Sequence, residues 1–317
     1  MSEVDPPAGE PEVEVSGGAA QERPPRTQTP DGLPLGPKVF GPWAWITVIL
    51  PLIVYLCGNT FGGYLEGMRV EHVKKEEAKN GATDPVAADD LFTDTESAKT
   101  DVPEGMTSWF QRWFPWKQTW YPSTYTLTIA LVTVLILCGL PGYFRAPFRI
   151  TPWGIGVGIL GIVVWLGLWY LDEKLLGLGS LISPFLGGKR SEFNPFEALK
   201  DNPTWMYQFL GIRLFGMILV VPLIEEFFIR GFLMRYVDDP DWDQIPLGLA
   251  TYKAVVGVMI YAAVSHPGEL FAAVAWFGLI TWLYLKTKNI WDCVIAHSIT
   301  NALLAVYVLV TKTWVLW

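Results

Sequence analysis

The chain has 317 residues, of which 51% are hydrophobic and 14% are aromatic. This composition is typical of a polytopic membrane protein and excludes an ordinary soluble domain. The net charge of −8 disfavours a nucleic-acid partner, because binding to phosphate backbones requires a basic surface.

The N-terminal third begins with a polar tail and contains one membrane span. Residues 1–38 are rich in Pro, Gly and Glu and lack periodicity, which predicts a disordered tail without a signal peptide. Residues 39–60 are predicted to form the first transmembrane helix, and residues 61–123 an extramembrane loop. Near its end, four tryptophans at spacings of four, three and four share a helical face, which predicts an anchor in the headgroup region. They are Trp109, Trp113, Trp116 and Trp120.

Six further apolar runs follow the loop, and each is long enough to be considered as a membrane span. They cover residues 124–144, 153–171, 205–236, 246–264, 270–286 and 290–310. The predicted fold is therefore all-α, with about seven transmembrane helices around a buried polar site and the lipid bilayer as a partner. We divide this part into residues 124–203, which hold the second and third spans and a linker, and residues 204–317, which hold the candidate catalytic core.

The short links after the second, fourth and sixth spans carry five basic residues; the opposing links hold a comparable number, but the longest of them counts for less in setting the orientation. The five residues are Arg145, Arg149, Arg235, Lys286 and Lys288. Because basic residues are enriched in cytoplasmic links, this pattern predicts a cytoplasmic N-terminus.

The run 205–236 contains two adjacent glutamates, Glu225 and Glu226, and an arginine, Arg230; such residues are costly at membrane depth and so indicate a functional site. Glu226 and Arg230 are four residues apart, so they face the same side of a helix and can form an ion pair. Such a pair can be purely structural, because either charge alone would be expensive to bury. Glu225 has no local cation at this spacing, so it is the candidate general base.

Polar residues near the C-terminus suggest where Glu225 finds its partners. His297 and Asn301 are four residues apart, share a helical face, and could donate hydrogen bonds to a developing oxyanion. His266 ends the fifth run just before Pro267, so it meets His297 only if this span is short, tilted or broken at mid-depth; we expect the break. Pro222 should kink the helix of Glu225 and free a backbone carbonyl, that of Ile218.

The order Glu-Glu-x-x-x-Arg, then His closing a helix, then His-x-x-x-Asn resembles the CPBP intramembrane glutamic proteases, also called the CAAX protease and bacteriocin-processing (ABI) family. The similarity covers residues 213–310 and includes the link 283–291 before the last motif. The family's second motif usually has Phe four residues before the histidine, whereas Ala262 stands there and Tyr261 precedes it. The N-terminal two-thirds resemble the exosortase-associated branch of CAAX protease-related bacterial proteins more than they resemble the prenyl-protein enzymes.

This resemblance implies an intramembrane endopeptidase that uses neither metal nor another cofactor. Glu225 would activate a water for attack on a peptide carbonyl, and His266 would hold that water. His297 and Asn301 would stabilise the oxyanion. The ion pair of Glu226 and Arg230 would shape the site. The implied substrate is a membrane-associated peptide or protein, lipidated or not, and the implied location is a bacterial inner membrane.

Three other functions use the same residues. A zinc-dependent hydrolase could use two histidines and a glutamate as ligands, but the chain has no His-Glu-x-x-His motif. A non-catalytic scaffold or immunity protein could keep the fold without the chemistry. A proton-coupled transporter could use the buried carboxylates as a relay, although no internal repeat supports it.

Overall fold

The computed structural model describes residues 26–79, 118–177 and 192–317. Within these ranges the secondary structure is helical, apart from an isolated antiparallel bridge between Gln28 and Pro34. The predicted all-α fold is confirmed.

Five helices are long and apolar enough to cross a membrane: Trp45–Glu76, Tyr121–Cys138, Pro152–Leu176, Pro267–Thr287 and Ile290–Thr311. A shorter apolar helix, Tyr252–Ser265, and a composite helical segment over residues 203–238 accompany them. Each of the seven predicted apolar runs overlaps one of these segments, and five of the segments qualify as membrane spans among the described residues.

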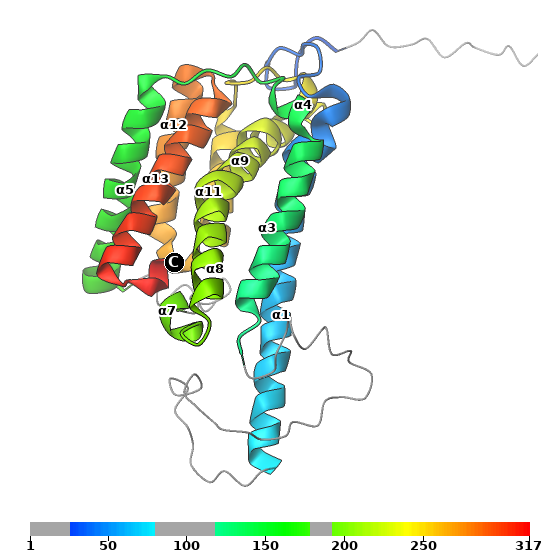
Figure 1. Ribbon diagram of the computed structural model, residues 1–317. Coiled ribbons are helices and arrows are strands. Elements are labelled where there is room, and N and C mark those ends of the chain that lie inside the picture. The colour runs from blue at the N-terminus through cyan, green and yellow to red at the C-terminus, as the bar shows by residue number, and fades with distance from the viewer. Residues whose placement is uncertain (1–25, 80–117, 178–191) are drawn as a thin grey trace, which may run out of the picture.

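Helices α1 (Leu50–Lys79) and α3 (Tyr121–Cys138) pack side by side on one flank of the molecule (Figure 1). Their approach depends on glycines: a Cβ at Gly58 would lie 2.5 Å from the hydroxyl oxygen of Thr128. Small residues at a helix interface permit such close packing in membranes. Helix α1 extends past the predicted end of the first span at residue 60, and an ion pair between Glu66 and Arg69 at 2.7 Å supports the extension.

On the opposite flank, α5 (Pro152–Leu171) packs against α12 (Leu270–Thr287) and α13 (Ile290–Thr311) (Figure 1). A Cβ at Gly158 would lie 2.8 Å from the carbonyl oxygen of Ala296, so glycine allows α5 to lie directly on α13. This contact fixes the height of the part of α13 that carries His297.

The composite segment lies between the two flanks (Figure 1). Along it, α-helical pieces alternate with wider, π-helical turns. Its parts are α8 (Pro203–Phe215), η4 (Gly216–Val220), α9 (Val221–Glu226), η5 (Phe227–Leu233) and α10 (Met234–Asp238). The elements η4 and η5 are π-helical, so both glutamates sit on a short α-helical piece between two π-helical turns. Such turns are frequent at functional sites.

Helix α11 (Tyr252–Ser265) has 14 residues and is therefore about 21 Å long, too short for a full crossing. His266 follows it directly, and a 3₁₀ turn, η7 (Pro267–Glu269), leads into α12. The expected break before Pro267 is present. The remaining short elements are η1 (Gly41–Trp43), η2 (Trp45–Ile49), α4 (Leu140–Tyr143), η3 (Asp172–Leu176), α7 (Pro195–Ala198), η6 (Trp242–Gln244) and η8 (Trp314–Leu316).

The predicted disordered tail differs from the structure over residues 26–38. Arg26 binds both carboxylate oxygens of Asp239, at 3.0 and 2.8 Å, and the amide of Gly36 donates to the carbonyl of Gln244 at 2.8 Å. These partners lie about two hundred residues away, so the composition of the tail gives no sign of them. Residues 1–25 lie outside the described residues.

The predicted tryptophan anchor is only partly covered by the structure. Trp109, Trp113 and Trp116 lie outside the described residues. Trp120 is buried at the start of α3, with 3% of its surface exposed, so this ring contacts protein and does not face headgroups.

Candidate active site

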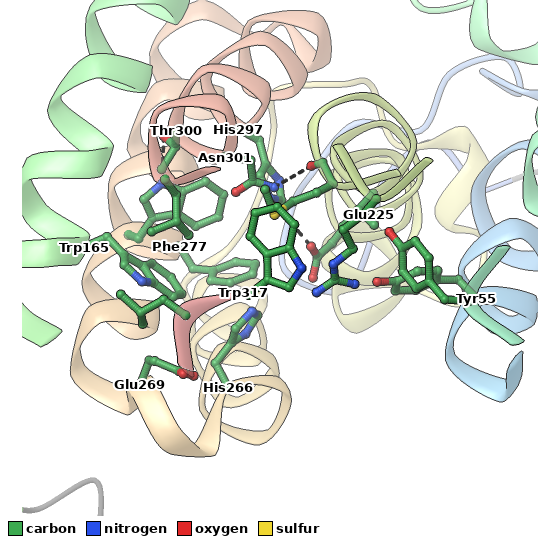
Figure 2. Close-up of a pocket in the computed structure, with 17 residues that line it drawn as sticks. Tyr55, Trp165, Glu225, His266, Glu269, Phe277, His297, Thr300, Asn301 and Trp317 are labelled. Atoms are coloured by element: carbon green, nitrogen blue, oxygen red, sulfur yellow. Dashed lines mark hydrogen bonds and ion pairs between the residues drawn. The ribbon is translucent and has the colours of Figure 1, made fainter. Parts of the chain in front are cut away.

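A cavity of about 120 Å³ lies among α1, α3, α5, α8, α9, α12 and α13. The structure places all four predicted catalytic candidates, Glu225, His266, His297 and Asn301, on its wall. Figure 2 shows Glu225, His297 and Asn301 together at one end of the site and His266 at the other. Residues more than seventy positions apart in the sequence thus share one enclosed space.

Behind the cavity, the carboxylate of Glu226 contacts the side chains of Arg230 and His297. Its Oε2 lies 2.9 Å from an NH group of Arg230, and its Oε1 lies 2.9 Å from Nδ1 of His297. Glu226 and Arg230 are both fully buried. The predicted ion pair is present, and it also fixes the ring of His297.

Glu225 has different partners from its neighbour. The hydroxyl of Tyr261 donates a hydrogen bond to Oε1 of Glu225 at 2.7 Å, and Nε2 of His297 lies 4.0 Å from Oε2. Among the described residues, no lysine or arginine lies within ion-pair distance of this carboxylate. Sequence analysis missed Tyr261 as a partner and noted it only as the aromatic neighbour of the position where Phe is usual.

The charges of this cluster constrain its protonation. Glu225 and Glu226 supply two negative charges, and Arg230 supplies one positive charge. The buried set becomes neutral when a single proton resides on either Glu225 or His297, and a neutral set has the lowest desolvation cost. Oε2 of Glu225 and Nε2 of His297 lie 4.0 Å apart, so a proton on either group would lie close to the other.

His297 is oriented by its surroundings. Because Glu226 is the acceptor at Nδ1, this nitrogen carries a proton and Nε2 is turned toward Glu225. The ring of Trp276 packs against the imidazole edge-on, with centroids 4.5 Å apart. The imidazole can therefore change its protonation only at Nε2 without losing its position.

Asn301 is held by a backbone carbonyl that the π-helical turn releases. The amide of Val221 bonds to the carbonyl of Gly216, five residues earlier, and Pro222 has no amide hydrogen to offer the next carbonyl. The carbonyl of Met217 instead accepts a hydrogen bond from Nδ2 of Asn301 at 2.8 Å. A freed carbonyl was predicted, but at Ile218; the wide turn shifts it to Met217. One N–H of the amide of Asn301 remains for another acceptor.

His266 is fixed at the far end of the cavity. Ser265 donates its hydroxyl proton to the carbonyl of Tyr261 at 2.7 Å, so its oxygen accepts from Nδ1 of His266 at 2.8 Å. The imidazole lies between the rings of Trp165 and Phe277, whose centroids are 5.6 and 5.7 Å away. In this tautomer Nε2 is the hydrogen-bond acceptor.

Two further ionisable residues line the cavity that sequence analysis did not select. Glu269 is buried, and its Oε2 has no hydrogen-bond partner. Arg213 stacks over the ring of Tyr125 at 4.7 Å, and its Nε is buried without a partner. The signal for Arg213 was in the sequence: it lies in the apolar run 205–236, twelve residues before Glu225, with no acidic residue three or four positions away.

In residues 26–79, 118–177 and 192–317, no group of three His, Cys, Asp or Glu side chains is arranged to hold a metal ion.

Taken together, the fold and the cavity define a multi-pass membrane protein with a buried glutamate–histidine site. Residues 207–303 match the model of the family described as type II CAAX prenyl endopeptidase Rce1-like. The matched part runs from α8 into α13 and contains every predicted site residue. No curated protein and no solved structure matches the chain. The match gives no support to the exosortase-associated branch.

Proposed function

We propose that the protein is an intramembrane endopeptidase whose catalytic base is Glu225. The family match supports a protease of prenylated or other membrane-associated substrates. The observation that carries the proposal is the setting of Glu225, which faces a cavity, has no Lys or Arg partner in the described chain, and lies 4.0 Å from His297.

In the proposed reaction, Glu225 takes a proton from a water while the water oxygen adds to the carbonyl carbon of the scissile peptide bond. Imidazolium at His297 keeps Nδ1 on Glu226 and donates Nε2–H to the oxyanion, and the remaining amide N–H of Asn301 donates to it as well. Glu225 then passes its proton to the amide nitrogen as the carbon–nitrogen bond breaks. The products are a new carboxyl terminus and a new amino terminus.

The other site residues act on this chemistry indirectly. The hydroxyl of Tyr261 holds Glu225 in one rotamer, and Arg230 holds the carboxylate of Glu226 in place beside His297. His266, with Nε2 as an acceptor, is suited to holding a water in the cavity. No metal or other cofactor enters these steps.

The test uses the purified full-length protein in lipid bilayers and two peptides of identical sequence ending in a CAAX motif, one farnesylated and one not. Mass spectrometry should find cleavage of the farnesylated peptide and slower cleavage of the unmodified one. Intact peptides after prolonged incubation with protein that melts cooperatively would contradict the proposal.

We also propose that the N-terminus is cytoplasmic. The links carrying Arg149 and Lys288 meet at one end of the bundle, where the side chain of Asn289 donates to the carbonyl of Arg149 at 2.6 Å. The N-terminal segment lies at the same end (Figure 1). Membrane-impermeant labelling of a cysteine placed in the link 145–151, in sealed inside-out and right-side-out vesicles, tests this orientation.

A further inference from the structure

Arg213 is the only lysine or arginine among the described residues that line the cavity. It comes from α8, and its guanidinium lies among aromatic rings, 4.7 Å from the centroid of Tyr125 and 5.9 Å from those of Tyr121 and Trp317. In the described part of the chain it forms no ion pair with a carboxylate, and its Nε makes no hydrogen bond. This is a half-buried cation with aromatic neighbours, a buried Nε and no carboxylate partner among the described residues.

Arg230, on the same composite segment, is a buried cation with a structural role and can be compared with Arg213. It lies 2.9 Å from Glu226 and is fully buried. An unpaired cation at membrane depth is costly and indicates a functional group with an external partner. The two carboxylates that also line the cavity, Glu225 and Glu269, do not supply that partner.

We propose that Arg213 forms a subsite for the C-terminal carboxylate of the peptide that Glu225 cleaves. A guanidinium presents paired N–H donors that match a carboxylate in a bidentate arrangement. The guanidinium lies over the ring of Tyr125, whose buried hydroxyl has no hydrogen-bond partner within the described ranges and can supply a further donor on this wall. This inference rests on the proposed function.

The position of Arg213 favours a peptide over a lipid as the source of the anion. Arg213 lies ten residues into α8, a rise of about 15 Å from the polar loop before Pro203. A lipid phosphate lies at the headgroup level, whereas an extended peptide can enter the cavity to that depth.

The spacing to Glu225 sets the length of peptide that fits. Twelve residues of helix separate Arg213 from Glu225, a rise of about 18 Å, and an extended chain covers about 3.3 Å per residue. If the C-terminal carboxylate of the peptide binds Arg213, the peptide bond that lies beside Glu225 is at most about five residues upstream of that carboxylate.

Tyr55 and Tyr125 come from α1 and α3, outside the part of the chain that matches the family. The first helical pair thus contributes to the proposed subsite.

The test compares a farnesylated CAAX peptide that has a free C-terminal carboxylate with the same peptide as a C-terminal amide. Wild type should cleave the acid at least about tenfold better in kcat/KM, mainly through KM, as expected for a lost charge-assisted contact. Arg213→Gln should cleave both forms alike, at the rate wild type shows for the amide. Arg149→Gln, which alters an exposed arginine outside the cavity, should keep the wild-type ratio.

The acid-to-amide ratio separates binding from folding, because loss of folded protein lowers both rates equally. If Arg213→Gln does not fold, Arg213→Lys decides: it keeps the charge, loses the paired donors, and should lower the ratio several-fold. A wild-type enzyme indifferent to amidation, or a variant with an unchanged ratio, would overturn the proposal. Equal loss for both peptides, seen only in bilayers containing phosphatidylglycerol, would assign Arg213 to a lipid phosphate and also overturn it.

Binding of both peptides to Glu225→Gln, measured by fluorescence anisotropy, distinguishes this inference from the proposed function. Preference for the acid that depends on Arg213, with no cleavage by wild type, would contradict the peptidase and leave a carboxylate subsite. Cleavage by wild type without such a preference would contradict the subsite alone.

Discussion

The Glu226–Arg230–His297 cluster and the Arg26–Asp239 pair use the same kinds of side chain in different surroundings. Arg230 and Glu226 have no exposed side-chain surface, whereas 48% of the side chain of Arg26 is exposed and only that of Asp239 is covered. A charge left alone in the buried cluster keeps its full desolvation cost. A charge left alone at the surface is solvated by water and screened by salt.

This difference indicates what each cluster does. The buried cluster holds the imidazole of His297 in one orientation beside Glu225, so a change there should affect the whole fold. The surface pair attaches the N-terminal segment to the loop after α10, so a change there should affect only that segment. Three predictions test this contrast.

The largest effect is expected for Glu226→Gln. The neutral amide leaves Arg230 buried without a counter-charge, which should lower the free energy of unfolding by about 3–5 kcal/mol. Thermal melting in detergent, or recovery of folded protein after purification, measures the loss. Glu225→Gln, at the adjacent residue, is the matched control and should melt near wild type. Equal melting temperatures for Glu226→Gln and wild type would mean that the ion pair does not hold the fold.

A smaller effect is expected for Arg26→Gln. The hydrogen bonds from Arg26 hold the pKa of Asp239 below its usual range. A depressed pKa in the folded state gives stabilisation that is present above the unfolded value of about 3.9 and is lost as the pH falls through the lower folded value. The protection of the amides of Gly36 and Val39 from hydrogen exchange, corrected for the intrinsic pH dependence of exchange, should therefore be high at neutral pH and fall in acid.

In Arg26→Gln the same amides should exchange faster already at neutral pH, by a small factor because the side chain of Arg26 is half exposed. Lys253→Gln removes the exposed ion pair with Asp31 and serves as the control, with a smaller change expected. Unchanged exchange at Gly36 in Arg26→Gln would show that the backbone contacts to Asp243 and Gln244 hold the segment without the ion pair.

No effect is expected from chelation. Because Glu225 is proposed to activate water without a metal, wild type should contain no stoichiometric zinc and should keep its activity in EDTA. Elemental analysis and peptide cleavage before and after treatment measure this. About one zinc per chain, lost together with activity and restored by added zinc, would support the zinc hydrolase instead.

The sequence predicts those parts of the site that depend on one helix. Glu226 and Arg230 lie four residues apart, and helical periodicity alone brings them together. The same holds for the shared face of His297 and Asn301. The break after His266 could be predicted because proline cannot continue the hydrogen-bonding of the helix.

Contacts between helices could not be predicted in the same way. The bond from Tyr261 to Glu225 depends on how α9 and α11 are rotated about their axes, which a single sequence does not specify. The bond from Asn301 to the carbonyl of Met217 depends on a π-helical turn that shifts the free carbonyl by one residue. Arg26 meets Asp239 across more than two hundred residues, so tail composition predicts disorder where the fold supplies a partner.

The central claim is that Glu225 activates the water that cleaves the peptide bond. The most direct test incubates a farnesylated CAAX peptide in ¹⁸O-labelled water with wild type and with Glu225→Gln, at matched amounts of folded protein, and analyses the products by mass spectrometry. Wild type should release a product whose new carboxyl terminus carries ¹⁸O, and Glu225→Gln should be slower by about 10²–10⁴-fold, as expected for a lost general base. Cleavage by Glu225→Gln at the wild-type rate would contradict the account.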